Sequence, residues 1–156
     1  MDIGVGQQLN VDWLYMVRSG KAFTGYTNIG PSVGNVSEVQ LFNPVGSGKT
    51  AIVYRFFSSA SVAGIFNLSQ FNTQFASLGM TGVNLQSGGP AAACQVRNAT
   101  PVAQDGTIID LYELLVNTTR TVVDDWYTIL AAGQGLVASS QAVNLRLAGS
   151  FRWVEF

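Results

Sequence analysis

Residues 50–60, TAIVYRFFSSA, alternate in a way that restricts what this part of the chain can form. Successive side chains of a β-strand point to opposite faces, so the alternation divides these residues into two sets. One set is Ile52, Tyr54 and Phe56, and the other is Ala51, Val53, Arg55 and Phe57. β-Branched and aromatic residues favour a pleated surface. The pattern predicts a strand that directly follows the sequence GSGKT.

Other segments of the chain have the same character. VSEVQLFN (36–43) places Val39 and Leu41 on one face, and AACQVRN (92–98) is typical of a further strand. TIIDLYELLV (107–116) fits either a helical stripe or an alternating strand, and the strands expected around it favour a strand. SQFNTQFASLGM (69–80) fits a short helix or a turn.

The last 31 residues, 126–156, predict a strand, a tight turn, a strand, a turn and a final hairpin. Gly133 and Gly135 flank Gln134 at the first turn, and Ala148–Ser150 is expected to separate the strands of the hairpin. Short strands with glycine-bearing turns and little helical pattern predict an all-β fold. We expect a jelly-roll-like antiparallel sandwich over residues 36–156, in one domain.

Residues 1–35 differ from the rest and are expected to form an extended N-terminal arm. Residues 19–35, SGKAFTGYTNIGPSVGN, hold four glycines and one proline and show no sustained period. The arm has one short apolar stretch, from which Trp13, Leu14, Tyr15 and Met16 are predicted to bind a partner. A bare arm that exposed these side chains would be adhesive, so we expect it to dock.

The sequence GSGKT resembles the centre of a nucleotide phosphate-binding loop. In such a loop the first glycine stands five positions before the second, and this position, counted back from Gly48, is Asn43. Pro44 follows it and lacks the N–H group with which the loop would bind phosphate oxygens. A phosphate loop must also open a helix, whereas the residues after Thr50 have the period of a strand. The preferred interpretation is a turn, in which Gly46 and Gly48 permit positive φ.

Composition bears on several classes of function. Only 11% of the 156 residues are charged and the net charge is −1, so no basic nucleic-acid surface is predicted. The chain has no histidine and one cysteine, Cys94, which is expected to be a small buried apolar residue. A structural zinc site, a serine–histidine pair and any other cofactor site are therefore not expected. No window is apolar enough for a membrane span, and no signal peptide is expected.

Two sets of residues have a functional and a structural interpretation. Asp124 and Asp125 are adjacent carboxylates, for which a solvated turn is preferred over a metal or catalytic role. A second set of aromatic side chains fits either a sugar-binding platform or, preferably, core and subunit contacts: Tyr54, Phe56, Trp126, Phe151 and Trp153. We predict that the protein is not an enzyme.

Three stretches together resemble small structural proteins of tailed bacteriophages. They are VQLFNPVGSGKTAIVYRFF (39–57), ILAAGQGLVA (129–138) and VNLRLAGSFRWVEF (143–156). They are similar to the patterns V.LFNP.GSGK, L.PGQGL.V and F.W.E of these proteins, with Ala132 in the place of a proline. The resemblance covers about a third of the chain. It implies a virion component, such as a capsid decoration (cement) protein, with a jelly-roll core that is often trimeric.

The resemblance and the composition lead to one expected function and two alternatives. The expected function is to bind the assembled phage head and stabilise it by bridging capsomers, as a homotrimer on the capsid surface. The expected partners are other copies of the chain and the major capsid protein, and neither nucleic acid nor membrane. One alternative is a tail or head-fibre accessory that binds a host receptor or carbohydrate. The other is an NTPase that uses the degenerate GSGKT loop.

Overall fold

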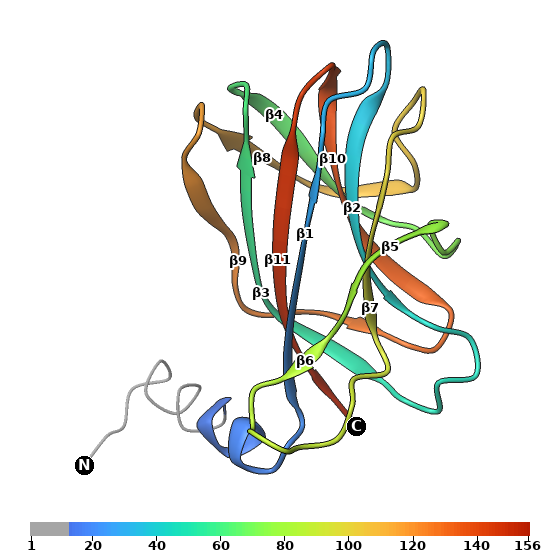
Figure 1. The fold of residues 1–156 in the computed structure, drawn as a ribbon, viewed down its shortest axis with the longest axis vertical. Coiled ribbons are helices and arrows are strands. Elements are labelled where there is room, and N and C mark those ends of the chain that lie inside the picture. Colours follow the sequence, from blue (N-terminus) through green and yellow to red (C-terminus); the bar gives the residue numbers. More distant parts are fainter. Residues whose placement is uncertain (1–12) are drawn as a thin grey trace.

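A computed structural model describes residues 13–156, apart from the side chains of residues 125 and 126. The described chain is a sandwich of two antiparallel sheets (Figure 1). The all-β sandwich expected from the sequence is therefore confirmed, and the jelly-roll arrangement stays a prediction. Residues 13–18 are helical and precede the first strand.

The first sheet, called sheet A here, has five strands in the order β6-β1-β11-β3-β9. Its strands are β1 (Ala22–Ile29), β3 (Ala51–Ala60), β6 (Val83–Asn84), β9 (Thr119–Leu130) and β11 (Leu147–Glu155). β11 lies at the centre of the sheet, where it pairs with β1 on one side and with β3 on the other.

The second sheet, called sheet B, has six strands in the order β5-β7-β2-β10-β4-β8. Its strands are β2 (Val36–Asn43), β4 (Gly64–Gln70), β5 (Ser77–Thr81), β7 (Gln95–Ala99), β8 (Thr107–Leu114) and β10 (Gln134–Val143). Residues 107–114 thus form a strand, as the surrounding pattern favoured. Residues 69–80 contain the end of β4, a loop and most of β5, and no helix.

The core lies between the two sheets and is rich in aromatic side chains. Phe56 and Phe151 of sheet A are stacked with their ring centroids 4.5 Å apart, and Phe56 meets Tyr112 of sheet B edge to face. Val39 and Leu41 of β2 both point into this core, as expected, and Cys94 is buried there. Burial raises the pKa of the Cys94 thiol, as does the neighbouring carboxylate of Glu155.

The alternation predicted for residues 50–60 is interrupted at Tyr54. The pairing of β3 with β11 shifts there, because Trp153 lies opposite Val53 and Arg152 lies opposite Arg55. This bulge leaves one extra residue in β3, so Val53 and Phe56 both face the core although the simple alternation put them on opposite faces. The assignment of faces beyond Val53 was therefore wrong by one residue.

The prediction of an extended arm is wrong for residues 22–29. These residues form β1, which pairs with β11 along its whole length, from Ala22 opposite Val154 to Ile29 opposite Leu147. Gly25, which gave this stretch an irregular appearance, is required by packing. A Cβ atom there would lie 2.7 Å from the side chain of Val96 and 3.3 Å from Trp153.

The position expected for the last turn was also wrong. Ala148–Ser150 belongs to the interior of β11, and the chain turns instead at residues 144–146. Gly149 is a packing residue, because a Cβ atom there would lie 2.6 Å from Val39 and 2.9 Å from Phe56. The glycine thus permits the close approach of the two sheets.

Candidate functional site

The GSGKT sequence lies in the loop that connects two strands of different sheets. β2 ends at Asn43 and β3 begins at Ala51, so a strand follows the loop where a phosphate loop would need a helix. Gly46 and Gly48 have φ values of 77° and 66°, as the turn interpretation requires. The predicted turn is confirmed, and the absence of nucleotide binding stays a prediction.

Asn43 explains why this loop carries its particular residues. Its Nδ2 donates to the carbonyl oxygens of Lys49, at 2.8 Å, and Leu130, at 3.0 Å, and its Oδ1 accepts from Ser47 Oγ. Its own carbonyl oxygen accepts from the N–H of Gly133. Asn43 therefore joins the GSGK loop to the AAGQG turn, so two of the three sequence stretches that resemble phage proteins form one structural unit.

The third stretch, at the end of β11, has a structural role of its own. The Oε1 of Glu155 accepts from Trp153 Nε1 at 2.8 Å and from the N–H of Cys94 at 2.9 Å. The N–H of Ala93 donates to the same carboxylate. Tryptophan and glutamate two residues apart thus fix the chain that enters β7. The Phe151–Trp153–Glu155 pattern is explained by packing and hydrogen bonds.

The predicted partner-binding residues lie in the helical segment 13–18, and they are not equivalent. Trp13 stacks on Tyr54 of β3, with ring centroids 4.4 Å apart and an angle of 12° between the rings. Trp13 therefore contacts its own sandwich and covers one end of the outer face of sheet A. Leu14 and Tyr15 are exposed, and Met16 is half-buried. Leu14 and Tyr15 remain available to a partner.

The aromatic set and the carboxylate pair receive structural assignments. Tyr54, Phe56, Phe151 and Trp153 are buried, so these four are packing residues, and the side chain of Trp126 lies outside the described part. Asp124 lies within β9 and not in a turn, and its Oδ1 is 2.6 Å from Arg55 Nε. Nothing is described of the Asp125 side chain. The described residues contain no cluster of three or more acidic or cysteine side chains arranged for a metal ion.

Glu38 is the one described carboxylate with a strongly shifted pKa. Burial on the outer side of sheet B raises the pKa of Glu38 to about 7. Hydrogen bonds from Ser139 Oγ and from the N–H of Asp105 have the opposite effect and only partly offset this rise. The side chain is 0% exposed, and its Oε2 has no hydrogen bond to any described residue. A substrate has no access to this carboxylate, so its role is structural.

The edge of sheet B has a concentration of exposed apolar side chains. β8 is the last strand of the sheet, and five side chains on it or beside it are each more than half exposed: Ile65, Ile108, Leu111, Leu115 and Val116. We call this group the apolar edge. A sheet edge with exposed apolar side chains tends to pair with another protein surface. The stretch TIIDLYELLV was recognised as a strand, but its exposure could not be read from its pattern.

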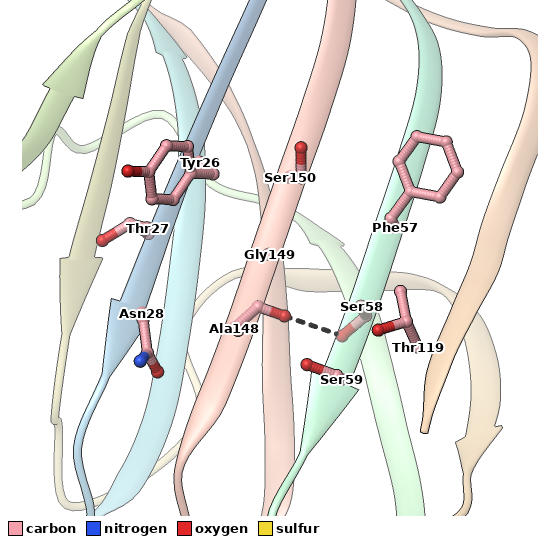
Figure 2. Close-up of a pocket in the computed structure, with 10 residues that line it drawn as sticks. All are labelled: Tyr26, Thr27, Asn28, Phe57, Ser58, Ser59, Thr119, Ala148, Gly149 and Ser150. Carbon is pink, nitrogen blue, oxygen red and sulfur yellow. Dashed lines mark hydrogen bonds between the residues drawn. The ribbon is translucent and has the colours of Figure 1, made fainter. Parts of the chain in front are cut away.

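A shallow groove crosses the outer face of sheet A (Figure 2). Its volume is about 290 Å³. Tyr26 of β1 and Phe57 of β3 stand on its two sides, and Ser150 of β11 lies between them in the same row. The next row adds Asn28, Ala148 and Ser59. Sequence reasoning missed this groove because Tyr26 was assigned to an arm and Ser150 to a turn.

Comparisons with protein families, with curated proteins and with solved structures find no match to this chain. No helix in the described residues is long and apolar enough to cross a membrane.

Proposed function

We propose that this chain is a structural component of a bacteriophage particle, of the capsid decoration type, and that it acts by binding other proteins. The observation that carries the proposal is the apolar edge, whose five large side chains face solvent on the edge strand β8 or beside it. Only 11% of residues are charged, so little charge repulsion opposes association of copies. The three stretches that resemble phage structural proteins support the same function.

The strand order supports the expected jelly roll. In sheet A the strands β1, β11, β3 and β9 are neighbours, and in sheet B the strands β2, β10, β4 and β8 are neighbours. Early and late strands therefore alternate across both sheets, as in a chain folded from two Greek keys. Because this fold also serves many unrelated functions, the strand order supports the architecture and not the activity.

Bridging capsomers requires two kinds of contact. We assign the contact between copies in the expected homotrimer to the apolar edge. We assign the contact with the major capsid protein to Leu14 and Tyr15, because they are exposed on a segment that Trp13 anchors to the sandwich. Each large apolar side chain that becomes fully buried at such a contact contributes roughly 1.5–3 kcal/mol.

Light scattering tests the contact between copies. The purified protein should have about three times the chain mass of 16.6 kDa. The double variant Leu111→Ser, Leu115→Ser should be a folded monomer, because it removes two exposed side chains and none from the core. The matched control is Val33→Ser, Val102→Ser, which changes two exposed loop residues and should leave the trimer intact. A monomeric wild-type protein at tens of micromolar would contradict the assignment.

Co-sedimentation tests the contact with the capsid. The probe is empty heads assembled from the major capsid protein encoded in the same genome. The wild-type protein should sediment with these heads, and Leu14→Ser, Tyr15→Ser should weaken the attachment at least about tenfold, given the apolar surface lost. If neither the wild-type protein nor any variant sediments with heads, the decoration function is wrong.

A further inference from the structure

We propose that the groove on the outer face of sheet A binds a neutral saccharide ring. The inference goes beyond the proposed function and does not depend on attachment to a capsid. It rests on the spacing of two aromatic side chains, on the polar groups between them and on the absence of charge among the lining residues. The sugar platform considered from the sequence used other residues, four of which are in fact buried.

The walls of the groove are aromatic and are held at a fixed separation. Tyr26 and Phe57 lie directly opposite Ser150 from its two sides, so two strand spacings separate them. The backbones of β1 and β3 are therefore about 9.5 Å apart, which is enough to admit a flat ring between or across the two side chains. Arg152 in the neighbouring row lies over the Phe57 ring, 5.2 Å from its centroid, and so restrains that ring.

The floor of the groove is small and rigid. Ala148, Gly149 and Ser150 of β11 form it, and the sheet hydrogen bonds on both sides of β11 hold them in place. Ser58 Oγ, which donates to the carbonyl oxygen of Ala148, adds a side-chain link between β3 and β11 beneath the groove (Figure 2). Larger side chains at positions 148 or 150 would fill the space between Tyr26 and Phe57.

The polar groups around the floor are uncharged and available. The side chains of Asn28, Ser59, Thr119 and Ser150 form no hydrogen bond with another described residue. Each can donate and accept a hydrogen bond. The lining residues include no Lys, Arg, Asp or Glu. A phosphate or carboxylate ligand would find no opposite charge among the lining residues, and the guanidinium of Arg152 beside the groove already lies over the Phe57 ring, so the lining favours a neutral ligand.

A sugar ring fits this combination better than a peptide or a nucleotide. It presents an apolar C–H face to an aromatic wall and hydroxyl groups at its rim to side-chain amides and hydroxyls. The groove volume of about 290 Å³ lies at the small end of the range for ligand sites. One or two rings would occupy it, whereas a protein partner would need a much larger surface.

Saturation-transfer difference NMR on the full chain tests the proposal. The probes are lactose, maltose, cellobiose and N,N′-diacetylchitobiose, with glucuronic acid as a charged counterpart. At least one neutral probe should receive saturation, and glucuronic acid should not. Tyr26→Ala should weaken the binding of that probe about 3- to 10-fold, the range expected for one aromatic contact. Ser150→Phe should abolish binding by filling the floor.

Tyr15→Ala is the matched control, because Tyr15 and Tyr26 are almost equally exposed, at 65% and 66%, and only Tyr26 lines the groove. This variant should bind the sugar as the wild-type protein does. The proposal is overturned if no neutral probe binds, if Ser150→Phe binds undiminished, or if Tyr15→Ala loses binding as well. It is also overturned if Ser150→Phe changes the oligomeric mass, since the groove would then be a contact between copies.

Discussion

The outer faces of the two sheets differ in what covers them. On sheet B every residue of β2 is buried, including Glu38 and Gln40, whose side chains lie on the outer face. On sheet A the outer face has exposed residues such as Tyr26 and Ile129 along most of its length. The stacked pair Trp13 and Tyr54 covers one end of it. The outer face of sheet B is therefore covered over β2, while the outer face of sheet A is open along most of its length.

Polar side chains hold the cover on sheet B. Gln40 Nε2 donates to the carbonyl oxygen of Thr73 at 2.9 Å, and its Oε1 accepts from the N–H of Phe75 at 3.0 Å. Asn67 Nδ2 donates to Gln104 Oε1, and Gln104 in turn donates to the carbonyl oxygen of Ser140. Two loops are thus fastened over one sheet by side-chain amides. Their loss should be costly, because partners would be left buried and unpaired.

The difference teaches where this protein can interact with its surroundings. Sheet B binds its own loops on the outer side of β2, and its edge strand β8 is available for a contact. No loop among residues 13–156 is fastened over sheet A in this way, so the face of sheet A is available for a contact. The apolar edge and the groove share no residue, but they adjoin, because Leu115 of the edge and Thr119 of the groove line one pocket.

The largest effect is expected for Gln40→Ala, which removes the hydrogen bonds from Gln40 to the loop at residues 71–75. It leaves the buried N–H of Phe75 without its partner and removes the hydrogen bond to the carbonyl oxygen of Thr73, and we expect a loss of about 2–4 kcal/mol in unfolding free energy. Urea denaturation measures this loss. The control Gln70→Ala changes an exposed glutamine of β4 and should have little effect. Equal effects of the two variants would contradict the view that the loop over Gln40 stabilises the protein more than the exposed surface at Gln70 does.

A smaller, pH-dependent effect is expected for Glu38→Gln. The pKa of Glu38 is about 7 in the folded protein, above the ordinary value of 4.5, so folding favours the protonated form. The stabilisation is complete below about pH 4.5 and is lost as pH rises through 7. Glutamine resembles the neutral form at every pH, so the variant should gain on the wild type, by on the order of 2 kcal/mol at pH 8.

Unfolding midpoints measured from pH 4 to pH 9 test this expectation. Asp105 faces the same carboxylate, and its charge adds to the rise in pKa. Glu113→Gln, on the exposed side of β8, is the matched control and should follow the wild type across the range. A difference between Glu38→Gln and wild type that stays constant with pH would show that Glu38 does not titrate in this window.

The smallest effect is expected for Asp124→Ala on the open face of sheet A. Asp124 pairs with Arg55 at 2.6 Å, but the two side chains are 64% and 31% exposed, and water screens such a pair. The unfolding free energy should fall by less than about 1 kcal/mol. The loss should disappear in about 1 M salt, where charges are screened within about 3 Å. A loss as large as that of Gln40→Ala would mean that this face is not open.

The sequence predicted the class of fold because its strands alternate and its turns contain glycine. It did not predict the bulge at Tyr54, since one extra residue has no signature in an apolar stretch. It assigned Ala148–Ser150 to a turn because small residues are common in turns, whereas here Gly149 is required by contact with Val39 and Phe56. Small residues occur both at close packing contacts and in turns, so their presence in the sequence does not distinguish the two.

The two surfaces were harder to predict than the fold. Glutamate and glutamine, such as Glu38 and Gln40, are typical of solvent-facing positions in a strand. Here they are buried only because loops from later in the chain cover them. The groove depends on Tyr26, Ser150 and Phe57, which are brought together by pairing of β1, β11 and β3. No local sequence pattern indicates the register in which these three strands pair. The loop between Asn43 and Ala51 was predicted correctly because its proline and its following strand are local features.

The strand order has a consequence for how the chain folds. None of the first four strands pairs with another of these four, and β10 and β11 lie between them in the two sheets. The pairing of Ala22 with Val154 spans almost the whole described chain. Most ladders therefore close late and over long sequence distances, which is typical of folding in milliseconds to seconds. Until β10 and β11 arrive, each of the first four strands keeps one edge unpaired, and nascent chains are then most prone to aggregate.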